Sequence, residues 1–218
     1  MRLLNTFIKN SLALGARIFC GTTVLWYESQ PDDTCQRLYF ANHTSHLDAL
    51  VIWTVLPPAV REKPRIVAAK EYWDATPIRR YFASTVFNAL LINRESVSIK
   101  RTPIQIMIEE IKDEYSLVLF PEGGRSPDGT LGEFKSGLYY LCKKRPDLEL
   151  IPIYLNNLNY IMPRGETLPV PMLARVIFGP PMWIEANESK ESFLTRTRNA
   201  IVKLQQLEEV YEETEPQS

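Results

Sequence analysis

The sequence predicts a single α/β domain with a mostly parallel central sheet flanked by helices. Short apolar runs alternate with segments of helical periodicity along most of the chain, a pattern that places helices on the faces of a sheet. The run Leu117–Phe120 is uniformly apolar and stops at Pro121, as a central strand of a parallel sheet does when both its faces are buried. The length of 218 residues suits one domain with a substantial core.

The predicted strands are short, and the helices carry start and stop signals. We expect strands at Thr23–Tyr27, Arg37–Ala41, Arg65–Ala69, Ala89–Ile92, Leu117–Phe120, Leu150–Leu155 and Ala174–Phe178. Thr102 begins a capping box, with Pro103 at the first helical position. Further helices are expected over Lys135–Lys144 and Ser189–Tyr211. The acidic end of the chain, from Glu208 onward, should be solvated.

The first 27 residues carry three basic side chains and no acidic one, namely Arg2, Lys9 and Arg17. Polar residues interrupt this segment too often for a membrane-spanning helix. Basic charge without acid suits a helix on an anionic membrane surface, although a helix packed on the core fits the same residues. We therefore expect a membrane-surface segment over 1–27, a main domain over 28–211 and an acidic tail over 212–218.

Charge and cysteine usage exclude several functional classes. The 25 Lys and Arg residues are balanced by 26 Asp and Glu residues, so the broad positive surface of a nucleic-acid-binding protein is not expected. The three cysteines are far apart and form no C-x-x-C pair, which predicts neither a metal site nor a disulfide framework. A reducing compartment follows, and we expect a protein that is peripheral on the cytoplasmic face of a membrane.

His43 and Asp48 are the first candidates for chemistry. A neutral imidazole can take a proton from a hydroxyl near pH 7, and a carboxylate improves it by orienting the ring. Residues five apart lie about 140° apart on a helix, so His43 must be in a loop and Asp48 in the first helical turn. The pattern Ser45-x-x-Asp48 also resembles a capping box, in which Asp48 would only satisfy a helix terminus. We leave His46 outside the mechanism.

A second candidate site follows the clearest predicted strand. Gly123 and Gly124 in the run Phe120–Ser126 allow close backbone approach, and Arg125 offers a planar fork of donors that matches a phosphate. This composition predicts an anion site at the carboxyl end of the strand. The alternative is a glycine-rich turn with a solvated arginine.

Four segments in order resemble the motifs of the glycerolipid acyltransferase family. His43 and Glu122, in the first and third segments, are 122 − 43 = 79 residues apart. The second segment departs from the family pattern, which has Gly and an aromatic residue before its arginine, and Gly124 replaces a common Thr. The segments are Asn42–Asp48, Leu91–Arg94, Phe120–Ser126 with Phe134–Gly137 after it, and Ile151–Ile153.

The resemblance implies a glycerolipid acyltransferase-like fold and a role for each matched residue. His43 would deprotonate the acceptor hydroxyl, which attacks the acyl thioester directly, and Asp48 would orient His43. Pro152 would shape the acyl-chain site. The phosphorylated acceptor would be held by Arg94, Glu122, Gly123 and Arg125. Lys70 and Lys135 would be further contacts to phosphate. No metal or cofactor is implied, since the donor, acyl-CoA or acyl carrier protein, is a substrate.

The resemblance therefore implies transfer of a fatty acyl chain to lysophosphatidic acid, which gives phosphatidic acid. Another lysophospholipid or a lyso-aminolipid is an alternative acceptor, and a catalytically silent lipid-binding module is an alternative function. Membrane attachment would also use exposed apolar side chains such as Trp73, Tyr81 and Phe82. Tyr81 and Phe82 follow Arg79 and Arg80, a combination that suits a lipid interface, although a buried aromatic pair fits the same residues.

Overall fold

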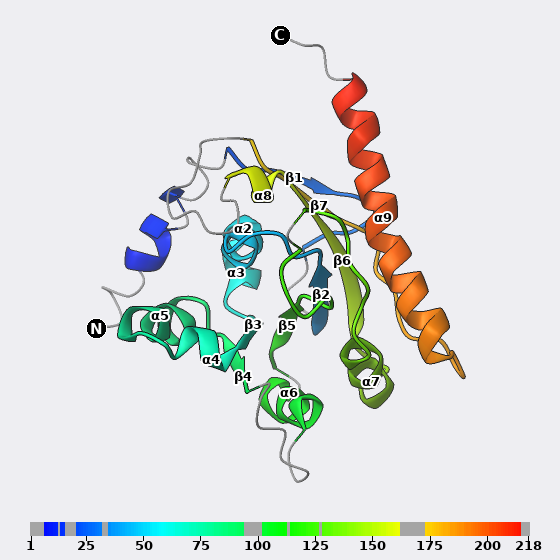
Figure 1. Ribbon diagram of the computed structural model, residues 1–218, viewed down its shortest axis with the longest axis horizontal. Coiled ribbons are helices and arrows are strands. Elements are labelled where there is room, and N and C mark those ends of the chain that lie inside the picture. Colours follow the sequence, from blue (N-terminus) through cyan, green and yellow to red (C-terminus); the bar gives the residue numbers. More distant parts are fainter. Residues whose placement is uncertain are drawn as a thin grey trace.

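The computed structural model of the protein describes residues 7–12, 14–15, 21–31, 35–93, 102–112, 114–126, 128–161 and 173–214 (Figure 1). Its centre is a seven-stranded sheet with the order β1-β7-β6-β2-β5-β3-β4. The strands are β1 Thr23–Trp26, β2 Arg37–Ala41, β3 Pro64–Ala69, β4 Leu90–Ile92, β5 Ser116–Leu119, β6 Glu149–Asn156 and β7 Arg175–Phe178.

The sheet is parallel except at one boundary. β1 pairs with β7 in parallel, whereas β7 lies antiparallel to β6, and the remaining neighbours are parallel. The predicted α/β class is confirmed, and each of the seven strands lies within one residue of its expected bounds at either end. β5 is an interior strand between β2 and β3.

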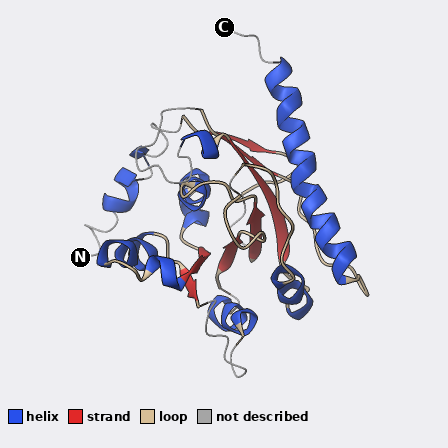
Figure 2. Cartoon of the chain, in the orientation of Figure 1, coloured by secondary structure: helices blue, strands red, loops and turns tan. Residues whose placement is uncertain are grey.

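Helices cover both faces of the sheet (Figure 2). They are α2 Asp48–Val55, α3 Pro58–Arg61, α4 Lys70–Trp73, α5 Pro77–Tyr81, the π-helix η1 Phe82–Val86, α6 Pro103–Ile111, α7 Gly137–Lys144, α8 Leu158–Ile161 and α9 Lys190–Thr214. The capping box of α6 forms as predicted: the Thr102 side chain accepts from Gln105 N at 3.3 Å, and Thr102 N donates to Gln105 Oε1 at 2.9 Å.

Two apolar clusters form the core, one on each face of the sheet. Successive side chains of a strand point to opposite faces, so Leu38 and Phe40 of β2 join the cluster that includes Leu138 of α7 and Phe193 of α9. Tyr39 joins the cluster that α2 covers. Burial on both faces explains why the apolar run of β5 is continuous rather than alternating.

The C-terminal helix corrects one expectation about the acidic end of the chain. α9 continues to Thr214, three residues beyond the boundary expected at 211. Glu208 is buried rather than solvated, because its carboxylate pairs with Arg175 Nη1 of β7 at 3.3 Å and accepts from Asn156 Nδ2 of β6 at 3.1 Å. These contacts tie the far part of α9 to the sheet.

The described part of the N-terminal region is helical at its start and contacts the main domain. Residues 7–12 and 14–15 are helical, and Lys9 Nζ pairs with Glu62 Oε2 at 2.8 Å while Leu12 packs against the core. Phe7 and Leu14 are exposed. Thr23–Trp26, which the division at residue 27 assigned to the N-terminal segment, belong to the sheet as β1. Of the helices that are described, none is long and apolar enough to cross a membrane.

Candidate active site

His43 and Asp48 meet where the chain leaves the carboxyl end of β2. His43 lies in the loop and Asp48 is the first residue of α2, the arrangement that their spacing predicted. His43 Nδ1 is 2.8 Å from Asp48 Oδ2, and the Asp48 side chain is 0% exposed. Because an ionised carboxylate only accepts hydrogen bonds, Nδ1 carries the proton and Nε2 is the basic nitrogen.

Asp48 also anchors the loop that holds the histidine. Its Oδ2 accepts from Thr44 N at 2.7 Å and from Ser45 N at 2.9 Å. The Ser45 hydroxyl accepts from Leu47 N at 3.3 Å, so the reciprocal capping box is not completed. Asp48 therefore holds the backbone and orients the imidazole with the same oxygen.

The imidazole of His43 is also fixed on one face. It stacks on Phe120, with ring centroids 4.1 Å apart and an angle of 21° between the planes. Phe120 directly follows the strand β5 and is 9% exposed. Stacking on a buried ring restricts the rotation of the imidazole.

Glu122 ties the two loops together. Its Oε1 accepts from His43 N at 2.8 Å and its Oε2 accepts from Gly132 N at 2.9 Å, while Ser126 N donates to the His43 carbonyl at 2.8 Å. Burial raises the pKa of the Glu122 carboxyl. A Cβ at Gly132 would come within 2.9 Å of Oε2, so a larger residue there would require the Glu122 carboxylate to shift.

The expected role of Glu122, to hold the phosphorylated acceptor, has no support in this geometry. Both of its oxygens are engaged with backbone amides, and its side chain is not among those that line the neighbouring cavity. A carboxylate would also repel a phosphate. Glu122 instead links the loop of His43 to the loop of Gly132.

A cavity of about 640 Å³ opens beside His43, within the size range of ligand sites. It lies at the carboxyl ends of β3 and β5, where α/β proteins commonly bind ligands. One part of the lining is polar or charged and consists of His43, His46, Arg125 and Lys135. The remaining walls are largely apolar and include Ile66, Val67, Ile92, Met107, Leu119 and Leu138. The cavity suits an amphipathic ligand.

Arg125 and Lys135 supply positive charge to this cavity. Arg125 Nη1 is buried and has no hydrogen-bond partner within the described ranges. Gly123 has φ +74°, and a Cβ there would lie 3.3 Å from Lys135 Cγ, so the lysine stem packs across the glycine. The expected residues His43, Gly123, Arg125 and Lys135 are thus brought to one cavity.

Two further described residues that were expected at the site, Lys70 and Pro152, do not line this cavity. Lys70 is exposed at the start of α4, with Nζ 3.9 Å from Asp74 Oδ2, and does not line the cavity. Pro152 lies in β6 beside Phe40 of β2, and its carbonyl accepts from Gly179 N at 2.9 Å, so it packs within the sheet. Arg94 lies outside the described residues.

The profile of the family described as "Acyltransferase" matches residues 30–156, more than half of the chain. The chain belongs to the acyltransferase family. The match spans the loops that carry His43, Asp48, Glu122 and Arg125, which are the loops that meet at the cavity.

Curated acyltransferases share a similar level of identity with this one. The chloroplastic 1-acyl-sn-glycerol-3-phosphate acyltransferase BAT2 of Brassica napus is 27% identical over 68% of this chain and 41% of its own length. The chloroplastic LPAT1 of Arabidopsis thaliana is 30% identical over 64% of this chain and 37% of its own. The chain therefore spans about two fifths of the length of these relatives.

The fold is similar to that of a solved acyltransferase. The crystal structure of the 1-acyl-sn-glycerophosphate acyltransferase PlsC from Thermotoga maritima superposes with a TM-score of 0.70 at 17% identity, covering 98% of this chain and 82% of that one. This likeness confirms the expected glycerolipid acyltransferase-like fold. At this level of identity the comparison concerns the fold alone.

Sequence reasoning missed several residues of this acyltransferase site. His46 and Tyr72 line the cavity, and Trp73, expected on the surface, lines it as well. Trp73 and Phe82 pack against the core, whereas Tyr81 is 37% exposed as expected. Phe120 could have been found from the sequence, because it is the aromatic residue that ends the apolar run before Pro121. No local pattern marks Tyr72, because β3 and α4 reach the cavity only through the sheet order.

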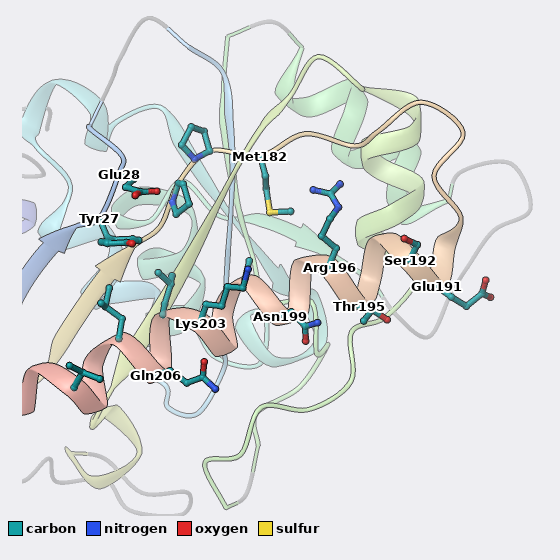
Figure 3. A pocket seen from close by; sticks show the side chains of 16 residues that line it. Tyr27, Glu28, Met182, Glu191, Ser192, Thr195, Arg196, Asn199, Lys203 and Gln206 are labelled. Carbon is teal, nitrogen blue, oxygen red and sulfur yellow. The ribbon is translucent and has the colours of Figure 1, made fainter. Parts of the chain in front are cut away.

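A larger hollow of about 1020 Å³ lies elsewhere in the acyltransferase, between α9 and the segments after β1 and β7. Figure 3 shows Tyr27 and Met182 across from Arg196 and Lys203 of α9. Neither histidine lines it. We therefore place the chemistry at the smaller cavity.

Proposed function

We propose that this acyltransferase moves a fatty acyl chain from acyl-CoA or acyl carrier protein to the free hydroxyl of lysophosphatidic acid, which gives phosphatidic acid. The observation that carries the proposal is the His43–Asp48 pair facing a cavity with apolar walls and two cationic side chains. The names of the plant relatives, which describe 1-acyl-sn-glycerol-3-phosphate acyltransferases, support the same acceptor.

The proposed reaction needs one base and no covalent acyl-enzyme. His43 Nε2 takes the proton of the acceptor hydroxyl while its oxygen attacks the thioester carbonyl carbon. The tetrahedral intermediate collapses as the C–S bond breaks, and the departing thiolate takes the proton from the imidazolium. Asp48 stabilises the imidazolium between these two steps.

The negative charge that forms on the thioester oxygen needs a hydrogen-bond donor. Gly124 lines the cavity, and within the described part of the chain its N–H forms no hydrogen bond. We assign this amide as the donor. Arg125 and Lys135 hold the phosphate, so binding and charge stabilisation come from the same loop and its continuation.

We further propose that the protein is peripheral on the cytoplasmic face of a membrane. The exposed Phe7 and Leu14, together with the exposed Ile78 and Tyr81 of α5, are apolar contacts that a lipid surface would cover. Sedimentation with vesicles tests this proposal. Binding should increase with the fraction of anionic lipid, and equal recovery with and without vesicles would contradict it.

The reaction is tested with purified protein, lysophosphatidic acid and palmitoyl-CoA. Release of free thiol should accompany the formation of phosphatidic acid, measured by mass spectrometry, and His43→Ala should abolish both. Thiol release without an acceptor would indicate a thioesterase instead. Transfer only to other acceptors in a panel of lysophospholipids and lyso-aminolipids would correct the acceptor, and no transfer to any of them would indicate a silent lipid-binding module.

A further inference from the structure

The second histidine of the chain lies in the same cavity as the base. His46 follows His43 by three residues in the loop before α2 and is half-buried. It lines the cavity together with Arg125 and Lys135. The catalytic scheme above does not use it, although an imidazole beside two cations is a potential hydrogen-bond donor to an anion.

A stack of three side chains holds His46 in place. Its ring lies nearly parallel to that of Tyr72 of α4, with centroids 5.4 Å apart and an angle of 20°. Arg79 of α5 lies over the Tyr72 ring, with Cζ 4.3 Å from the centroid. The Tyr72 hydroxyl is 3.3 Å from His46 Nδ1, and the ring makes no other hydrogen bond with the described residues.

The hydroxyl contact determines which nitrogen can face a ligand. When the Tyr72 hydroxyl donates to Nδ1, the proton of the neutral ring is on Nε2, which then acts as a donor. When the ring is charged, both nitrogens carry protons and the tyrosine oxygen accepts. In both of these states Nε2 carries a proton, and His46 lines the cavity.

The surroundings of His46 lower its pKa and so favour the neutral ring. Burial lowers its pKa first, followed by the positive charge of Arg125 from the loop after β5, by His43 of its own loop whenever that ring is protonated, and by the positive charge of Arg79 from α5. Asp48 of α2 acts in the opposite direction. A doubly charged phosphate held by Arg125 would reverse the sign of this field, because an anion nearby favours the charged imidazole.

We propose that His46 is a binding residue for the phosphate of the acceptor, donating from Nε2 and gaining a proton when the phosphate binds. The proposal rests on the proposed function, because it takes the acceptor to be phosphorylated. It adds a third donor beside Arg125 and Lys135. It also gives Tyr72 and Arg79 a role as positioning residues, since they orient the imidazole without contacting the ligand.

The test compares the wild type with His46→Phe, which keeps an aromatic ring in the stack but removes both nitrogens. A hydrogen bond to a charged group corresponds to roughly a 10- to 100-fold change in binding. We expect the KM for lysophosphatidic acid to rise by about that factor while kcat stays within about threefold. Tyr72→Phe should raise the KM less, and Tyr160→Phe, on an exposed residue of α8, should leave it unchanged.

The pH dependence separates recognition from packing. Between pH 6.5 and 8.5 the wild-type KM should increase with pH, because the proton taken up on binding becomes harder to obtain. His46→Gln, which keeps a donor but cannot titrate, should show a KM close to that of the wild type at high pH and no such increase. This second variant keeps the proposal testable if His46→Phe does not fold.

Two results would overturn the proposal, and they differ in what else they remove. If the wild type acylates lysophosphatidic acid but both His46 variants keep its KM and its pH dependence, the role of His46 is wrong and the proposed function stands. If the wild type acylates only acceptors without a phosphate, or none, the role of His46 fails together with the proposed function.

Discussion

The substitution Asp48→Asn isolates the charge of the buried carboxylate from its hydrogen bonds. The amide oxygen of asparagine can take the place of Oδ2 and keep the bonds from His43 Nδ1, Thr44 N and Ser45 N. The amide nitrogen would then occupy the place of Oδ1, which accepts no hydrogen bond from the residues described here. What is lost is the negative charge beside the imidazolium.

The size of the effect follows from the geometry. Nδ1 and Oδ2 are 2.8 Å apart, and with both charges spread over their groups the effective separation is about 4 Å. For a partly buried pair at an effective dielectric constant of about 20, the interaction is roughly 4 kcal/mol. This energy corresponds to about a 10³-fold lower kcat, with little change in the KM of the acceptor.

The measurement is the steady-state release of thiol with lysophosphatidic acid and palmitoyl-CoA, alongside thermal unfolding. Asp48→Ala serves as the matched control, because it removes the charge and also leaves the Thr44 and Ser45 amides without an acceptor. Each unpaired buried donor costs about 1–3 kcal/mol, so Asp48→Ala should have the lower Tm. A kcat for Asp48→Asn within tenfold of the wild type would refute the charge argument.

Three further predictions concern residues of different roles. Glu122→Gln should lower kcat and Tm without raising the acceptor KM, because its side-chain NH₂ would oppose one of two backbone donors; a raised KM with unchanged kcat would restore a phosphate role. Arg125→Ala should raise the KM for lysophosphatidic acid about tenfold or more, and an unchanged KM in the same assay would contradict its assignment. Burial raises the pKa of Cys142 to about 12, so at pH 8 only about one thiol in 10⁴ is ionised. Iodoacetamide should label the exposed Cys35 of the native protein and spare Cys142, which peptide mass spectrometry can check.

The dyad illustrates how far local reasoning reached into the site. Its spacing required a loop histidine and a carboxylate in the first helical turn, and both are found. The competing interpretation of Asp48 as a helix cap was correct in part, since the same oxygen accepts two backbone amides. A local pattern could not distinguish the two roles, because one buried carboxylate serves both.

The sequence by itself determined the strands, the capped helix and the meeting of His43 with Asp48, because each depends on residues within one short segment. An apolar run forms a buried strand whatever its place in an α/β sheet. A loop histidine can reach an aspartate five residues later without a contribution from distant parts of the chain. The resemblance to a family of acyltransferases added the segment Phe120–Ser126 to the candidate site.

Only the tertiary structure decided which side chains share the cavity. Glu122 meets His43 across 79 residues of sequence, and the bond engages a backbone amide, which leaves no pattern in side-chain types. Lys70 directly follows β3 and Pro152 is part of β6, but neither side chain lines the cavity. His46 does line it. The physical reason is that the sheet order places β2, β5 and β3 side by side, so non-local pairing selects the residues that meet.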